Sequence, residues 1–229
     1  MTQSSHITVE EHEKQISGLK RRVKRQRMVG YYNGFLDGIL STVGPEDVIV
    51  DCGANVGEIT TRMAASGATV YAFEPDPWTF ERLENNTKSL ENVTRIQSAV
   101  GATAGEFTLF RTPDFDDRPK RASVASSIVP GMRDVDHNAE GIPVTVIDFP
   151  IWLEKLLDEG KNVALLKIDI EGAEIDLVNA LMDRDIPNRV GMILVETHEK
   201  QMPAEADRFA ALRERANKFP SNKINLDWI

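Results

Sequence analysis

The chain has 229 residues, of which 41% are hydrophobic and 28% are charged, and this ordinary globular composition excludes a wholly disordered protein. Its 36 acidic residues outnumber 27 basic ones, and the formal net charge of −9 disfavours nonspecific binding along nucleic acid. The single cysteine, Cys52, excludes an internal disulfide framework and a multi-cysteine metal site. No apolar run resembles a signal peptide or approaches the ~20 residues of a membrane span, so we expect a soluble, cytoplasmic protein.

The first 43 residues are expected to form a helical arm. Residues 1–29 are polar and predict an exposed helix, in which the basic run Lys20–Arg27 is either a solvated face or a contact for nucleic acid or an acidic carrier. Residues 30–43 place apolar side chains close to every fourth position, which predicts a short amphipathic helix lying on the main domain. A Gly-Pro pair ends this helix, so the domain proper is expected to span residues 44–229.

From residue 48 onward, apolar strand-like runs alternate with helix-like segments. Strands are expected at residues 48–53, 68–75, 93–100, 105–112, 143–149, 163–170, 190–198 and 221–229. Helices are expected at residues 56–67, 77–91, 151–160, 172–184 and 204–218. This alternation is typical of right-handed βαβ units, so the sequence predicts one α/β domain with a mostly parallel sheet and helices on both faces.

A glycine-rich turn follows the first predicted strand. Gly53 and Gly57 permit a tight turn and a close backbone approach to a ligand at the start of the next helix. Glu74 ends the second predicted strand, 21 residues after Gly53, where a carboxylate can bind both hydroxyls of a ribose. The two features together predict a nucleoside-containing cofactor. The alternative is a purely structural turn with Glu74 exposed to solvent.

The charges around this turn indicate which cofactor it suits. Asn55 and Glu58 occupy the second and third glycine positions of the dinucleotide fingerprint, and a carboxylate at the third position would repel a pyrophosphate. The phosphate-binding loop of nucleoside triphosphatases is absent as well. S-adenosylmethionine fits better, because it has a ribose and an adenine, no phosphate, and two cationic groups that acids such as Asp51 suit.

Residues 112–142 are rich in Asp, Pro, Ser and Arg and show no periodicity. A loop of about 30 residues inside a compact domain is usually functional. The segment is therefore a candidate lid that binds the acceptor, the molecule that would receive the methyl group of S-adenosylmethionine. The alternative is a mobile polar loop. Cations here could bind a phosphate or carboxylate of the acceptor, and hydroxyls could bind a sugar. The residues concerned are Arg111, Arg118, Lys120, Arg121, Ser123, Ser126 and Ser127.

Charged side chains lie at the end of the buried strand predicted at residues 163–170. Alternation places Lys167, Asp169 and Glu171 on one side, at the carboxyl end where parallel sheets bind ligands. Asp169 is expected to act beside the cofactor. Glu174, in the first turn of the next helix, is expected mainly to stabilise the start of that helix.

His198 ends the next buried strand and is expected in the same crevice as Asp169. It is a candidate base for an acceptor hydroxyl or a hydrogen-bond partner of the acceptor oxygen, and Asp169 would orient that hydroxyl or share the base role. A surface or structural histidine is the alternative. The predicted catalytic set is therefore His198, Asp169 and Lys167. Asp169, Glu196 and His198 would in principle suit Mg²⁺, but their spacing is not diagnostic and no metal site is assigned.

Several motifs resemble those of one enzyme family. V-I-V-D-C-G-A-N-V-G-E looks like the first motif of class I S-adenosylmethionine-dependent methyltransferases. The runs Y-A-F-E-P-D-P, Q-S-A-V-G, L-K-I-D-I-E-G-A-E and I-L-V-E-T-H together resemble the FkbM family over roughly residues 35–200. The resemblance implies a Rossmann-like fold and methyl transfer to hydroxyls of sugars, polysaccharides or polyketide-type products. It also implies a final antiparallel strand pair, for which the tail after His198 is short.

By this resemblance, the glycine-rich turn would face the methionine part of the cofactor, Glu74 would hold its ribose, and the segments at 75–76 and 98–99 would border its adenine. The predicted cofactor-binding set is Asp51, Gly53, Ala54, Asn55, Gly57, Glu74, Pro75, Asp76, Ser98, Ala99 and Asp169.

The sequence therefore predicts an S-adenosylmethionine-dependent O-methyltransferase acting on a hydroxyl of a saccharide or secondary metabolite. The expected partner is a small-molecule or glycan acceptor, nucleic acid is disfavoured, and a homo-oligomer is compatible with the sequence. The alternatives are a methyltransferase acting on RNA or protein, or a non-catalytic binding module with a methyltransferase-like scaffold.

Overall fold

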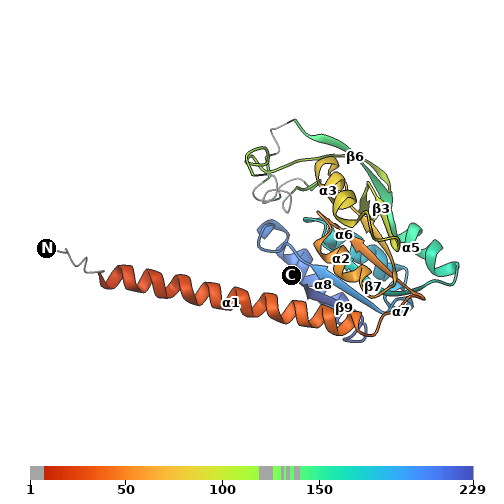
Figure 1. Ribbon diagram of the computed structural model, residues 1–229, viewed down its shortest axis with the longest axis horizontal. Helices are drawn as coiled ribbons and strands as arrows, with labels where there is room; N and C mark the ends of the chain where they lie inside the picture. The colour runs from red at the N-terminus through yellow and green to blue at the C-terminus, as the bar shows by residue number, and fades with distance from the viewer. Residues whose placement is uncertain (1–7, 119–125, 130–131, 133–134, 137–139, 229) are drawn as a thin grey trace. The chain divides into compact units, whose positions relative to one another are not determined.

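The computed structural model describes residues 8–118, 126–129, 132, 135–136 and 140–228. The chain divides into two compact units, Met1–Thr42 and Val43–Trp228 (Figure 1). The predicted site residues all fall within the second unit.

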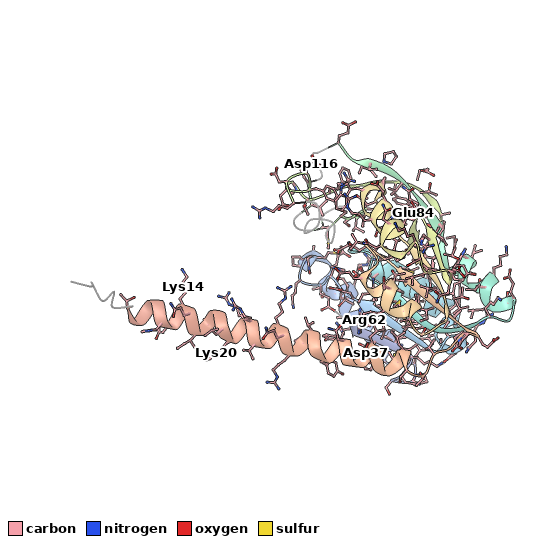
Figure 2. The ribbon with its side chains drawn as sticks, in the orientation of Figure 1. Lys14, Lys20, Asp37, Arg62, Glu84 and Asp116 are labelled. Atoms are coloured by element: carbon pink, nitrogen blue, oxygen red, sulfur yellow. The ribbon has the colours of Figure 1, made fainter. Side chains whose placement is uncertain are left out.

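The first unit contains one long helix, α1 (Val9–Leu40). The expected division into two helices is wrong, because Gly30 lies inside a continuous helix. A glycine there lowers helix stability by about 1 kcal/mol relative to alanine but does not remove a backbone hydrogen bond as proline would. Every side chain from Lys20 to Arg27 is exposed, and Figure 2 shows Lys14 and Lys20 projecting from the helix. No helix among the described residues is both long and apolar enough to cross a membrane.

A six-stranded parallel sheet forms the centre of the second unit, with the strand order β3-β2-β1-β7-β8-β9. Its strands are β1 (Asp47–Cys52), β2 (Thr69–Phe73), β3 (Val93–Ile96), β7 (Asn162–Ile168), β8 (Met192–Glu196) and β9 (Ile224–Trp228). The helices around it are α2 (Glu58–Ala64), α3 (Pro77–Thr87), α5 (Phe149–Asp158), α6 (Glu174–Asp183), α7 (Ile186–Arg189) and α8 (Ala206–Ala216), and a short 3₁₀ helix, η2 (Pro203–Glu205), precedes α8 (Figure 1). The α/β fold expected from the alternation is confirmed.

A second sheet, which the alternation does not predict, contains β4 (Ala99–Gly101), β5 (Gly105–Leu109) and β6 (Ile142–Asp148). The single strand expected at residues 93–100 is divided between the two sheets. Ser98 lies at the division, and its hydroxyl donates to the carbonyl of Thr145 at 2.8 Å. β6 pairs parallel with β4 and antiparallel with β5, so it does not enter the main sheet.

The last strand, β9, lies at the edge of the main sheet and pairs parallel with β8. The antiparallel pair expected from the family resemblance is therefore not present among the described strands. The reason is α8, which returns the chain across the sheet between β8 and β9, and such a crossover connection leads to parallel pairing.

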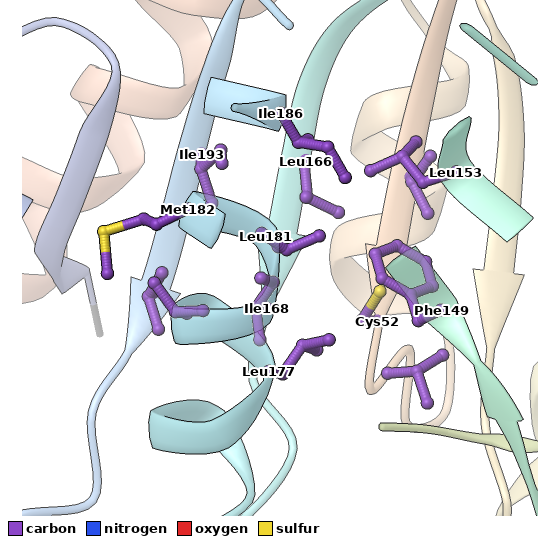
Figure 3. Packing of buried hydrophobic residues seen from close by; sticks show 14 of the residues in the cluster. Cys52, Phe149, Leu153, Leu166, Ile168, Leu177, Leu181, Met182, Ile186 and Ile193 are labelled. Atoms are coloured by element: carbon purple, nitrogen blue, oxygen red, sulfur yellow. The ribbon is translucent and has the colours of Figure 1, made fainter. Parts of the chain in front are cut away.

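The hydrophobic core fills the space between the main sheet and the helices α5 and α6 (Figure 3). Leu177 and Leu181 lie one turn apart on α6 and are fully buried, as the four-residue spacing predicts. Ile168 at the end of β7 is fully buried as well. Cys52 is a buried core residue, and burial raises the pKa of its thiol. This packing fixes the carboxyl ends of β1 and β7, from which the charged residues of the site emerge.

Candidate active site

A pocket lies at the carboxyl ends of the strands and is bordered by both sheets. Its lining contains many of the predicted cofactor-binding residues: Gly53, Asn55, Glu74, Pro75, Ser98, Ala99 and Asp169. It also contains residues that the sequence analysis did not assign to the site, namely Phe73, Val100, Leu109, Ile128, Ile170, Glu171 and Ala173. Among these, the alternation of the strand places Glu171 beside Asp169, although the predicted cofactor-binding and catalytic sets do not include it.

The turn after β1 is packed tightly against the end of β7. Gly53 has a φ of +78°, and a Cβ atom added there would lie 1.7 Å from the carbonyl oxygen of Asp169. Only glycine fits this position without displacement of the backbone. Asn55 also has a positive φ, which asparagine adopts more readily than most residues.

Glu74 joins this turn to the start of α3. Its two carboxylate oxygens accept the backbone N–H groups of Asn55 and Asp76, each at 2.9 Å. Burial raises the pKa of Glu74 to about 8, although these two N–H groups lower it. The carboxylate is thus held in position at the pocket wall, where the sequence analysis expects the ribose.

Three predicted cofactor-binding residues lie behind the pocket lining. Asp51 is fully buried and accepts a hydrogen bond from Thr60 at 2.7 Å. Asp76 accepts the backbone N–H groups of Trp78 and Thr79 at the start of α3, and it forms an ion pair with Arg111 at 2.7 Å. Ala54 is buried. These contacts support the turn and α3, which in turn carry the residues that line the pocket.

Gly57, the remaining member of the predicted set, precedes α2 with a φ of +89°. A Cβ atom added there would lie 2.9 Å from the Leu83 side chain of α3, so the glycine allows the two helices to pack.

Lys167 is buried and holds two strands together. Its ammonium group donates to the carbonyl oxygen of Gly53 at 2.7 Å and forms ion pairs with Asp51 at 3.2 Å and Asp169 at 3.4 Å. Burial alone would lower the pKa of Lys167, but the two aspartates raise it above its ordinary value. Lys167 is outside the pocket lining, and its contacts join the turn after β1 to the end of β7.

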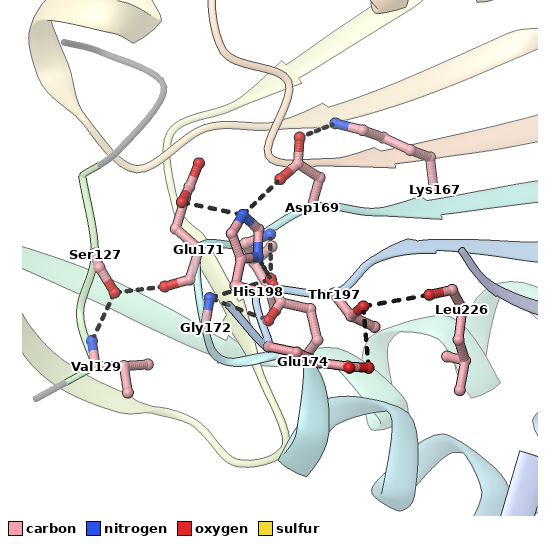
Figure 4. A network of polar contacts seen from close by, with 12 residues as sticks. Ser127, Val129, Lys167, Asp169, Glu171, Gly172, Glu174, Thr197, His198 and Leu226 are labelled. Carbon is pink, nitrogen blue, oxygen red and sulfur yellow. Dashed lines mark hydrogen bonds and ion pairs between the residues drawn. The ribbon is translucent and has the colours of Figure 1, made fainter. Parts of the chain in front are cut away.

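His198 lies in a cluster with three carboxylates at the ends of β7 and β8 (Figure 4). Its Nε2 atom is 3.2 Å from Glu171 and 3.9 Å from Asp169, and its Nδ1 atom is 3.0 Å from Glu174. Burial alone would lower the pKa of His198, but the hydrogen bonds with Glu171 and Glu174 raise it to about 11. His198 therefore lies beside Asp169, as expected from the strand ends, but it is outside the pocket lining.

Glu174 holds this cluster to the backbone. It is fully buried and accepts the N–H groups of Ile170 and Gly172 as well as His198 Nδ1. It therefore satisfies backbone donors at the start of α6, as the sequence predicts, and it also orients the imidazole.

Two further carboxylates in this region have perturbed pKa values. Burial raises the pKa of Glu171, against the lowering effect of its hydrogen bond with His198. Burial and the negative charge of Asp169 raise the pKa of Glu196 to about 7. Glu196 ends β8 beside the cluster, but its carboxylate is outside the convergent group formed by Asp169, Glu171 and His198.

The described part of segment 112–142 contacts the site. Ser126 and Ile128 line the pocket, and the hydroxyl of Ser127 donates to the carbonyl oxygen of Glu171 at 2.5 Å. Arg111 is engaged by Asp76, and Arg118 is exposed. The other residues predicted to bind an acceptor, Lys120, Arg121 and Ser123, lie outside the described residues.

Comparison with known proteins identifies relatives of this chain. Residues 51–219 match the methyltransferase FkbM domain. The chain is 23% identical over 192 residues to the hexuronic acid methyltransferase AglP of Haloferax volcanii, covering 82% of this chain and 71% of AglP. It is 28% identical over 176 residues to the 31-O-demethyl-FK506 methyltransferase FkbM of Streptomyces tacrolimicus, covering 68% of this chain and 66% of the relative.

A third relative is methyltransferase 1 of Beauveria bassiana, which is 30% identical over 154 residues. That match covers 61% of this chain and 60% of the relative, so the chain spans less than two thirds of that protein. The family match covers more than half of the chain and includes the glycine-rich turn, Glu74 and the acidic cluster. The chain therefore belongs to the FkbM methyltransferase family.

Proposed function

We propose that this protein transfers a methyl group from S-adenosylmethionine to a hydroxyl oxygen of a saccharide or secondary-metabolite acceptor. The observation that carries the proposal is the charge of the pocket. Among the described residues that line it, the ionisable side chains are the acidic groups of Glu74, Asp169 and Glu171, and none is basic. Such a lining suits a ligand with sulfonium and ammonium cations, whereas a pyrophosphate would meet carboxylates and no cation.

The residues present fit this cofactor. Glu74 offers a fixed carboxylate to the ribose hydroxyls, and the turn at Gly53 leaves backbone next to the pocket without a side chain in the way. Ser98 and Ala99 line the part of the pocket contributed by β4. When bound, the cofactor supplies a methyl group on a positively charged sulfur.

The half-buried carboxylates of Asp169 and Glu171 would orient the acceptor. An acceptor oxygen held by them forms its bond to the methyl carbon in line with the breaking carbon–sulfur bond, and this alignment accounts for much of the rate enhancement. The hydroxyl proton passes to a carboxylate oxygen of Asp169 or Glu171. Because both ring nitrogens of His198 face carboxylates, we assign it the role of holding these groups in place.

The names of the relatives support the acceptor class. One is named for a hexuronic acid, and another for a demethylated oxygen of FK506. The acidic pocket and the net charge of −9 disfavour an RNA acceptor. A non-catalytic binding module does not need an acidic cluster at the pocket wall. The presence of this cluster therefore favours an enzyme over a binding module.

Calorimetry with S-adenosylhomocysteine tests the proposal. We expect the wild type to bind and Glu74→Ala to bind at least about tenfold more weakly, because the variant loses a carboxylate that accepts hydrogen bonds from the ribose. Glu84→Ala is the matched control, since Glu84 is exposed on α3 (Figure 2) and is not among the residues that line the pocket. Binding of NADH in preference to S-adenosylhomocysteine, or equal affinity in the two variants, would contradict the proposal.

A further inference from the structure

Three side chains at the pocket wall converge on one point in the way that ligands of a metal ion do. Their nearest donor atoms, from Asp169, Glu171 and His198, all lie within 4.8 Å of one another. His198 Nε2 is 3.2 Å from Glu171 Oε2 and 3.9 Å from Asp169 Oδ1. Ligands about 2.0–2.2 Å from a cation are separated by about 3 Å at neighbouring positions, so little movement is needed to enclose an ion.

From this convergence we infer that Asp169, Glu171 and His198 form a binding site for a divalent cation such as Mg²⁺ or Mn²⁺. Two carboxylates and one imidazole are the donor types that such ions accept in proteins. The set differs from the one considered from sequence, because Glu171 takes the place of Glu196.

The residues behind the three ligands hold them in the required orientation. Glu174 accepts a hydrogen bond from His198 Nδ1, which fixes the ring and directs Nε2 toward the carboxylates. A carboxylate in this position behind an imidazole is the usual arrangement at metal centres. Lys167 pairs with Oδ2 of Asp169, so the other oxygen, Oδ1, is the one directed toward His198 (Figure 4).

The surroundings favour a cation and leave room for a substrate ligand. Glu174 and Glu196 add carboxylates next to the site, whereas Lys167 is the basic side chain paired with it among the described residues. Asp169 and Glu171 line the pocket, so the coordination positions not filled by protein face the space where an acceptor binds. The role of the ion rests on the proposed function: bound there, it would make an acceptor hydroxyl more acidic.

Titration with Mn²⁺ tests the site without reference to activity. The free ion is followed by electron paramagnetic resonance as the metal-free full-length chain is added, and we expect one bound ion per chain. Glu171→Gln and Asp169→Asn should each weaken binding at least about tenfold, because each loses a charged ligand. Glu196→Gln is the matched control: Glu196 is outside the convergent group, so this variant should weaken binding much less than either ligand variant does. Circular dichroism and urea unfolding establish that each variant is folded.

The outcomes separate the alternatives. No bound Mn²⁺ in the wild type would overturn the inference and leave a protonated His198 as the group that joins the two carboxylates. An equal loss in Glu196→Gln and Glu171→Gln would overturn the assignment of the ligands. The same samples are titrated with S-adenosylhomocysteine. Mn²⁺ binding without nucleoside binding would remove the proposed function and keep the metal site, and the reverse result would remove the metal site alone.

Discussion

Glu74 combines a structural contact with a place at the pocket wall. Its carboxylate accepts two backbone N–H groups, yet its burial is costly enough to raise its pKa to about 8. Asp76 raises this pKa as well, and Lys167 lowers it. Near neutral pH the group is therefore largely protonated in the ligand-free protein, whereas ribose hydroxyls that donate hydrogen bonds favour the ionised form.

This conflict predicts a pH-dependent affinity for the nucleoside. As the pH falls below about 8, binding has to displace a proton from Glu74, so affinity should fall by up to about tenfold per pH unit and level off above pH 8. Calorimetry with 5′-methylthioadenosine between pH 6 and 9 measures this effect, because that ligand lacks the amino acid part and its titrating amine.

Glu74→Gln is the control for this measurement and should show a weaker pH dependence. The comparison is needed because Glu196, with a pKa of about 7, titrates in the same range. Identical pH profiles for the variant and the wild type would show that Glu74 is not the titrating group.

At the scale of elements, the contact between the turn after β1 and the end of β7 determines the shape of the pocket. Lys167 crosses from β7 to the carbonyl oxygen of Gly53, and the backbone N–H of Asp169 donates to the carbonyl oxygen of Cys52 at 3.0 Å. The absence of a side chain at Gly53 lets the two segments approach this closely.

Position 53 needs glycine for two reasons, the close packing against Asp169 and the positive φ angle. Two glycine variants separate these two contributions to stability. Gly160 has a φ of +80° with no atom within 4 Å of an added Cβ, so Gly160→Ala should lose about 1–2 kcal/mol of unfolding free energy from backbone strain alone. Gly53→Ala adds a clash with Asp169 and should lose about 1–3 kcal/mol more. Urea denaturation measures both variants. Equal losses would mean that the turn moves freely away from β7.

The sequence best predicts the elements whose formation depends on residues close together in the chain. The strands β1, β2, β7 and β8 are short apolar runs next to helices with a clear apolar face, and their carboxyl ends carry the charged residues that the motifs indicate. The division between β3 and β4 and the second sheet depend on pairing with β6, more than 40 residues away in the chain. The acidic cluster was only partly predictable, because the distance between β7 and β8 side chains depends on tertiary packing.

At the scale of the whole molecule, α1 and the α/β unit differ in exposure and in charge. The described side chains from His12 to Arg27 are exposed, and the pocket lining lies entirely within the second unit. The charge is unevenly distributed along the chain: the run from Lys20 to Arg27 is strongly basic, whereas the pocket is acidic. The net charge of −9 does not show this difference, because it is a sum over all residues.

Removal of residues 1–27 should therefore leave both folding and nucleoside binding intact. We expect the free energy of unfolding to change by no more than about 0.5 kcal/mol, because the exposed side chains contribute little buried area. The affinity for 5′-methylthioadenosine should equal that of the full chain. A weaker affinity after this truncation would show that the N-terminal segment contributes to the pocket.

The hydrogen bond from Ser127 to the carbonyl oxygen of Glu171 has a consequence for the evolution of new specificities. The stretch that follows β5 borders the pocket through Ser126 and Ile128, and the same stretch is anchored to the backbone of Glu171, whose carboxylate lines the pocket. Remodelling this stretch to admit a bulkier alcohol would also shift Glu171. In the proposed enzyme, a change in acceptor selectivity would therefore also change the position of a carboxylate used in the reaction, and libraries that randomise residues 126–129 should vary Glu171 together with them.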